Sequence, residues 1–119
     1  MEKQHLKVCM RIWLEYESGE TLFGEGQITI LEAIEKEGSI NAGAKSLGMG
    51  YRSMWGRLKK IEQRMGFPLL IRRKGGAFGG QSVLTAEARL MIEKFRQLQQ
   101  DLNQAAVKIY DRIYPSQGS

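Results

Sequence analysis

The sequence predicts a small α+β fold that is mostly helical with a minor β component. Three observations lead to this fold class. Apolar residues recur at helical spacing in four segments, which are bounded by glycines and by hydroxyl residues that cap helices. Residues 6–16 instead alternate apolar and polar side chains, as a strand does. A chain of 119 residues has room for one domain, so we assign residues 1–119 to a single unit.

The first 23 residues predict an N-terminal β-hairpin. Residues 17–20, ESGE, are typical of a turn, and residues 21–23 would form a short returning strand. Gly24 and Gly26 interrupt the pattern before the first helix. The strand over residues 6–16 should have one buried face, made of Leu6, Val8, Met10, Ile12, Leu14 and Tyr16.

Three helices are expected within residues 27–65. The first covers residues 27–37 and ends at Gly38. Ser39 caps the second, residues 39–47, and the tight turn Gly48-Met49-Gly50 leads into the third, residues 51–65. The third helix should bury an apolar row formed by Met54, Leu58, Ile61 and Met65.

A second hairpin and a long helix complete the chain. Residues 67–73 and 82–84 are short strand candidates on either side of a glycine-rich loop, and residues 67–84 together form a wing-like hairpin. Thr85 caps the final helix, residues 86–113. Apolar residues on this helix step by four and three, the spacing of a coiled coil. This apolar stripe consists of Met91, Phe95, Leu98, Leu102, Ala105 and Ile109.

Two helices joined by a glycine turn, the second of them long and basic, predict a helix-turn-helix. At about 100° per residue, the side opposite the buried row of the third helix presents Arg52, Gly56 and Lys59. Hydrogen-bond donors near the start of such a helix suit the major groove of DNA. Gly56 costs the helix roughly 1 kcal/mol relative to alanine, which either close approach to DNA or tight packing would explain.

The charge distribution agrees with a nucleic-acid contact face. Residues 51–74 hold eight basic residues and one acid, a net charge of +7, so the rest of the chain sums to −2. A solvated helix face would have the same composition, so charge alone leaves both interpretations open. The residues expected to contact DNA are Lys45, Tyr51, Arg52, Ser53, Gly56, Lys59, Lys60, Arg72, Arg73 and Lys74.

Four features near the predicted contact residues have alternative interpretations. Trp55 lies at the edge of the buried row, where packing is favoured over DNA contact, and Tyr51 fits phosphate binding or packing. Arg57 lies near the buried side, as an intramolecular ion-pair partner would. The glycines of residues 75–80 could cradle an anion. No Gly-Lys-Ser/Thr follows them, which excludes a nucleotide-binding P-loop and favours a wing over a DNA groove.

Composition argues against several other classes of protein. The single cysteine, Cys9, excludes an internal disulfide and fits a reducing cytoplasm. One cysteine and one histidine do not make a four-ligand zinc site or a convincing catalytic set. No apolar run approaches the roughly 18 residues that a membrane span needs. We therefore expect a cytoplasmic protein that is not an enzyme, without cofactor, metal or membrane partner.

Residues 38–55, GSINAGAKSLGMGYRSMW, resemble the signature of ModE-type N-terminal DNA-binding domains. Residues 58–62, LKKIE, with Gly66, Leu69 and Arg72, resemble a pattern shared with LysR-type regulators, and residues 81–85, QSVLT, resemble the exit of the ModE wing. The resemblance covers about residues 23–110. It implies that residues 39–47 position the recognition helix 51–65, that residues 70–84 form the wing, and that residues 86–113 form a dimerisation helix.

Two features depart from that family. Gly50 stands where relatives often carry a capping serine, which weakens the cap by only a few tenths of a kcal/mol. ModE proteins continue into molybdate-binding domains, whereas this sequence stops. We therefore expect no molybdate binding by this chain alone. Molybdate recognition would need a second chain, or it is absent.

These observations predict a sequence-specific transcriptional regulator that binds double-stranded DNA. Helix 51–65 would enter the major groove, and residues 72–82 would contact the backbone or minor groove. The apolar stripe is longer than a small domain can cover from within, which predicts a homodimer. In the alternative, the helix folds back against the N-terminal strand. The alternative function is an interaction protein that pairs with another regulator, with DNA binding secondary; nonspecific DNA compaction is a third.

Overall fold

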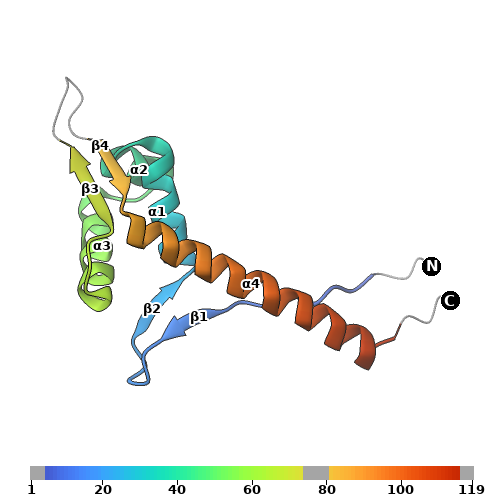
Figure 1. Cartoon of the computed structure of the whole chain (residues 1–119). Coiled ribbons are helices and arrows are strands. Elements are labelled where there is room, and N and C mark those ends of the chain that lie inside the picture. Colours follow the sequence, from blue (N-terminus) through green and yellow to red (C-terminus); the bar gives the residue numbers. More distant parts are fainter. Residues whose placement is uncertain (1–4, 74–80, 116–119) are drawn as a thin grey trace.

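The computed structural model describes residues 5–73 and 81–115 (Figure 1). Within these two ranges, four helices and two small antiparallel hairpins confirm the predicted α+β, winged helix-turn-helix fold. Helices α1, α2 and α3 gather with the β3–β4 hairpin at one end of the molecule, and α4 projects away from them. The elements in chain order are β1 (Trp13–Glu15), β2 (Thr21–Gly24), α1 (Glu25–Glu37), α2 (Ile40–Ser46), α3 (Tyr51–Met65), β3 (Leu70–Arg73), β4 (Gln81–Leu84) and α4 (Ala86–Ile113).

The core lies between α1, α2, α3 and the first turns of α4. As predicted, α1 buries Ile28, Leu31 and Ile34. Phe23 of β2 and Phe95 of α4 meet edge to face with ring centroids 5.5 Å apart, a favourable aromatic geometry. The buried row of α3 is confirmed in Met54, Leu58 and Ile61, whereas Met65 is only partly buried.

Helix ends follow the predicted capping residues. The hydroxyl of Ser39 accepts a hydrogen bond from the Ala42 N–H at 3.0 Å, and that of Thr85 accepts from the Ala88 N–H at 3.1 Å. Helix α1 begins at Glu25, two residues earlier than expected. Gly24 occupies its N-cap, and a glutamate in the first turn is stabilised by the positive end of the helix dipole.

Gly43 of α2 sets the close crossing of α2 over α1. A Cβ atom at this position would lie 3.0 Å from the Ile34 side chain and 3.1 Å from its backbone. Backbone cannot yield as a flexible side chain can, so any larger residue would push the two helices apart. Glycine at this position therefore allows α2 to pack closely on α1.

The β3–β4 hairpin pairs from Leu70↔Leu84 to Arg73↔Gln81. Its first strand starts at Leu70 rather than at residue 67, because the backbone of Leu69 is bound elsewhere. The Leu69 N–H donates to the Glu62 carboxylate at 2.8 Å, and its carbonyl accepts from the Thr85 N–H at 3.0 Å. These bonds fix the base of the hairpin to α3 and α4. The predicted loop 74–80 lies outside the described residues.

The predicted strand over residues 6–16 is wrong in length and in burial. Only Trp13–Glu15 pair with β2, because β2 ends at Gly24, where α1 begins, and earlier residues find no partner strand. The expected buried face is largely exposed, with Leu6 at 76% exposure. Ile12 is its one partly buried member, packed against the core.

The apolar stripe of α4 divides into two parts. Phe95 is only 2% exposed and belongs to the core, and Met91 is partly buried against it, so this end of the stripe packs within the chain, while the dimer interface itself stays a prediction. Beyond them Leu98, Leu102, Ala105 and Ile109 are exposed. Leu6 and Val8 are exposed too, so α4 does not fold back over the N-terminal segment to cover it.

Candidate DNA-binding surface

The turn between α2 and α3 places the start of α3 at the surface. The Met49 N–H donates to the Ala44 carbonyl at 2.8 Å, and Gly48 adopts a φ of 66°, which favours glycine. Gly50 is the N-cap of α3 and offers no side-chain hydrogen bond. The first N–H groups of α3 therefore lack the side-chain cap that a serine would supply.

One side of α3 faces away from the core and carries no acidic residue. Glu62, the only acid of α3, is partly buried and accepts a hydrogen bond from the Leu69 N–H. The exposed residues of the helix are therefore all basic or uncharged, so α3 itself presents no negative charge to a polyanion, although Glu20 lines a hollow together with Lys60 and Gln63. We call these residues the outer face of α3: Tyr51, Arg52, Ser53, Gly56, Arg57, Lys59, Lys60 and Gln63.

Gly56 lies in the middle of this outer face. A Cβ atom built at Gly56 would have no neighbour within 4 Å among the described residues. Tight packing against the described part of the chain therefore does not explain a glycine at this helical position. The sequence offered two explanations for Gly56, tight packing and close approach to DNA, and the second of these remains.

Trp55 joins α3 to the β3–β4 hairpin. Its indole is partly buried against the core, which agrees with the boundary packing favoured from the sequence. The Arg72 guanidinium carbon lies 3.5 Å from the ring centroid, and the Lys59 ammonium lies 5.9 Å away. Tyr51, itself exposed, meets the indole edge to face at 6.2 Å. Two cations thus lie on one aromatic ring.

The remaining predicted contact residues surround α3 unevenly. Lys45 is exposed in the last turn of α2, and Arg72 is exposed in β3. Arg73 is the last residue of β3, and Lys74 lies outside the described residues. Arg57 takes part in none of the ion pairs found in residues 5–73 and 81–115.

Arg64 is one of the eight basic residues of the segment 51–74, but it contacts the β1–β2 hairpin and does not belong to the outer face. Its guanidinium donates to the Thr21 carbonyl and lies 3.8 Å from the Glu20 carboxylate. The Tyr16 hydroxyl donates to the Arg64 carbonyl. These contacts fasten the β1–β2 hairpin to the end of α3. Charge counting could not separate this arginine from those on the outer face.

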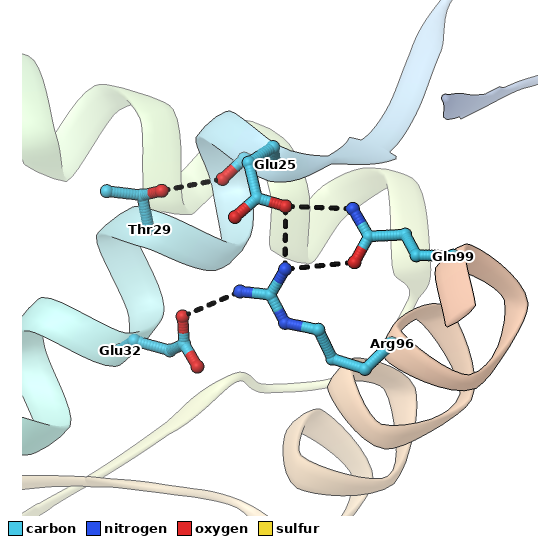
Figure 2. A network of polar contacts seen from close by, with 5 residues as sticks. All are labelled: Glu25, Thr29, Glu32, Arg96 and Gln99. Carbon is cyan, nitrogen blue, oxygen red and sulfur yellow. Dashed lines mark hydrogen bonds and ion pairs between the residues drawn. The ribbon is translucent and has the colours of Figure 1, made fainter. Parts of the chain in front are cut away.

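A polar network between α1 and α4 was not predicted from the sequence (Figure 2). Arg96 donates to Glu25 at 2.7 Å and to Glu32 at 3.0 Å, and the Gln99 amide donates to Glu25 at 2.9 Å. The Arg96 hydrogen bond, followed by that of Gln99, holds the pKa of Glu25 below its ordinary value. The sequence did contain a hint of this network. Glu25 and Glu32 are seven residues apart, as are Arg89 and Arg96, so each pair lies on one face of its helix. Arg89 also pairs with a glutamate of α1, Glu35, at 2.7 Å.

Two other kinds of feature, a metal-binding cluster and a membrane-spanning helix, are absent from the described residues. Across residues 5–73 and 81–115, no three histidine, cysteine, aspartate or glutamate side chains gather as a metal ion would require. None of the described helices combines the length and apolarity of a membrane span.

Comparison with known proteins identifies the family. Residues 26–89 match the model of the bacterial regulatory helix-turn-helix proteins of the lysR family. The chain is 32% identical over 93 residues to the molybdenum transport protein ModE of Azotobacter vinelandii, covering 78% of this chain and 34% of that protein. It is 35% identical over 74 residues to the DNA-binding transcriptional dual regulator ModE of Escherichia coli K12, covering 62% and 28%.

A solved structure shares the fold. ArgP from Mycobacterium tuberculosis superposes with a TM-score of 0.50 at 22% identity, covering 70% of this chain and 29% of that one. The chain spans about a third of the length of the curated relatives that it matches. The family match, which covers more than half of the chain, agrees with the ModE-type motifs in residues 38–55. The chain is similar to the ModE regulators, and it belongs to the lysR family of bacterial regulatory helix-turn-helix proteins.

Proposed function

We propose that this protein is a sequence-specific transcriptional regulator that binds DNA as a homodimer, with α3 in the major groove. The observation that carries the proposal is the composition of the outer face of α3. Four cations, Arg52, Arg57, Lys59 and Lys60, are exposed there beside hydroxyl and amide groups, with no acid among them. Arginine and amide side chains read base edges, and lysines neutralise phosphates.

The proposal assigns different tasks to different residues. Arg52 and Ser53 lie in the first turn of α3, the part of a recognition helix that reaches base edges, so they are proposed to read sequence. Lys45, Lys59 and Lys60 are proposed to contact phosphates. Residues 72–82 are proposed to lie on the backbone or in the minor groove.

Homodimerisation is proposed to use the far half of α4. Leu98 is 38% exposed, Leu102 36% and Ile109 49%, all on a segment that projects away from the core (Figure 1). A second copy could bury the same stripe by twofold symmetry. Two copies of α3 would then face half-sites separated by one or more turns of DNA, which predicts a roughly palindromic operator.

The test is selection of duplexes from a random pool by the purified protein, repeated with and without molybdate. A roughly palindromic consensus, bound with an affinity that falls steeply as salt rises, is the expected result. Retention of DNA without any consensus would indicate nonspecific compaction. Failure to retain DNA, combined with dimerisation through α4, would favour the interaction protein.

A further inference from the structure

Arg72 and Trp55 belong to different elements and are 17 positions apart, yet they form a close contact in the described structure. The guanidinium carbon of Arg72, on β3, lies over the indole of Trp55, on α3, 3.5 Å from the ring centroid. This distance is well inside the roughly 6 Å limit for a cation–π interaction. The arginine rests on the ring face while its side chain stays exposed.

A stacked guanidinium keeps its binding capacity. Its flat face contacts the indole, whereas its N–H donors lie in the guanidinium plane and point outward from its edge. Two of these donors match two oxygens of one phosphate. Within residues 5–73 and 81–115, the recorded ion pairs and side-chain hydrogen bonds do not include Arg72. Its donors are therefore available to a ligand.

The Trp55 ring brings this charge to the recognition helix. Lys59, one turn further along α3, lies 5.9 Å from the same ring, and Tyr51 packs against the ring edge. Arg72 is thus held next to the outer face of α3 although it belongs to the hairpin. Trp55 is itself partly buried against the core, so the platform is fixed in place.

We infer that Trp55 is a positioning residue for DNA binding. Its indole holds the Arg72 guanidinium beside α3, where the guanidinium binds a backbone phosphate flanking the groove that α3 enters. The inference rests on the proposed function and adds to it, because it gives Arg72 a phosphate contact that depends on Trp55. It also gives Trp55 a task in binding without requiring the indole to touch DNA.

A double-mutant cycle on DNA affinity tests this directly. Arg72→Gln should weaken binding of a selected duplex about tenfold in the wild-type background, as expected for loss of a charge-assisted contact. In a Trp55→Leu background the same change should cost only about twofold, because the arginine is no longer held in place. Trp55→Tyr, which keeps an aromatic face, should restore most of the coupling.

Lys60→Gln is the matched control for this cycle. It also removes one exposed cation from α3, but the cations recorded over the Trp55 ring are Arg72 and Lys59. Its cost should be the same in the wild-type and Trp55→Leu backgrounds. Equal costs of Arg72→Gln in both backgrounds, with DNA binding intact, would overturn the inference alone. A wild-type protein that binds no duplex would overturn the proposed function and the inference together.

A measurement on the free protein tests the contact without DNA. The chain has two tryptophans, so a Trp13→Phe background leaves Trp55 as the only indole fluorophore. Arg72→Gln should make this indole more accessible to acrylamide quenching, because the guanidinium no longer covers one face. Unchanged quenching would show that the stack is absent in solution and would overturn the inference even if the protein binds DNA.

Discussion

Replacing Gly56 with alanine should make the protein more stable and a weaker DNA binder at the same time. Gly56 is an exposed interior position of α3, and a Cβ atom there meets no described atom within 4 Å. The methyl group therefore creates no clash in the free protein. Alanine in place of a helical glycine stabilises by about 1 kcal/mol. For a chain of this length that corresponds to a rise in melting temperature of roughly 4 °C.

The same methyl group should obstruct DNA if the outer face of α3 lies against it. Inserting a methyl or methylene group into a close-packed contact typically costs about 1–3 kcal/mol. Converted to affinity, this is a loss of roughly 5- to 150-fold. The two effects have opposite signs, so weaker binding cannot be attributed to a damaged fold.

Thermal unfolding, monitored by circular dichroism, measures the effect on stability. Fluorescence anisotropy with a labelled selected duplex measures the effect on DNA affinity. Gly26→Ala is the matched control, because Gly26 is also exposed and helical with no atom within 4 Å of its Cβ position, but lies in α1. It should leave DNA affinity unchanged. A Gly56→Ala protein that is more stable and binds as tightly as wild type would refute close approach of DNA at this position. A less stable protein would refute the interpretation that Gly56 is free of internal packing.

Three further predictions concern the rest of the chain. Leu102→Asp should convert the dimer to a monomer in light scattering and leave the fold intact, whereas Phe95→Ala should cost about 3–5 kcal/mol of unfolding free energy because Phe95 is a core residue. A dimeric Leu102→Asp protein would exclude α4 as the interface. Glu25→Gln should lower stability at neutral pH by less than about 1 kcal/mol, since the Arg96–Glu25 pair is more than a third exposed. Because the folded-state pKa of Glu25 is lowered, this difference should be present above the ordinary glutamate pKa and disappear as the pH falls through the lowered value. A difference that persists in acid would show that the carboxylate charge is not its cause. Molybdate should produce no saturable heat with this chain in calorimetry. A hollow that brings Lys60 and Arg64 together is also lined by Glu20, an acidic residue that repels an oxyanion.

The helices could be predicted from the sequence because their signals are local. The bounds of α3 and α4, and the caps Ser39 and Thr85, agree with the structure. Each depends on periodicity and capping within a few residues. The winged helix-turn-helix arrangement followed from the order of these elements together with the family motifs.

The errors concern features that depend on distant partners. Alternation predicted a strand over residues 6–16, but a strand also needs a neighbour, and β2 pairs only with Trp13–Glu15. The spacing of α4 placed Phe95 in the apolar stripe without showing that Phe23 would cover it. Arg72 and Trp55 are brought together only when β3 folds back beside α3, so their contact could not be predicted from either local pattern.

The central claim, that the outer face of α3 reads DNA sequence, is tested most directly by comparing a selected duplex with a scrambled one. Arg52→Ala should weaken binding to the selected duplex by about 1–3 kcal/mol and leave the scrambled duplex almost unaffected. Lys60→Ala should weaken both alike and reduce the salt dependence by about one phosphate contact. An Arg52→Ala protein that binds the selected duplex as tightly as wild type would contradict the claim.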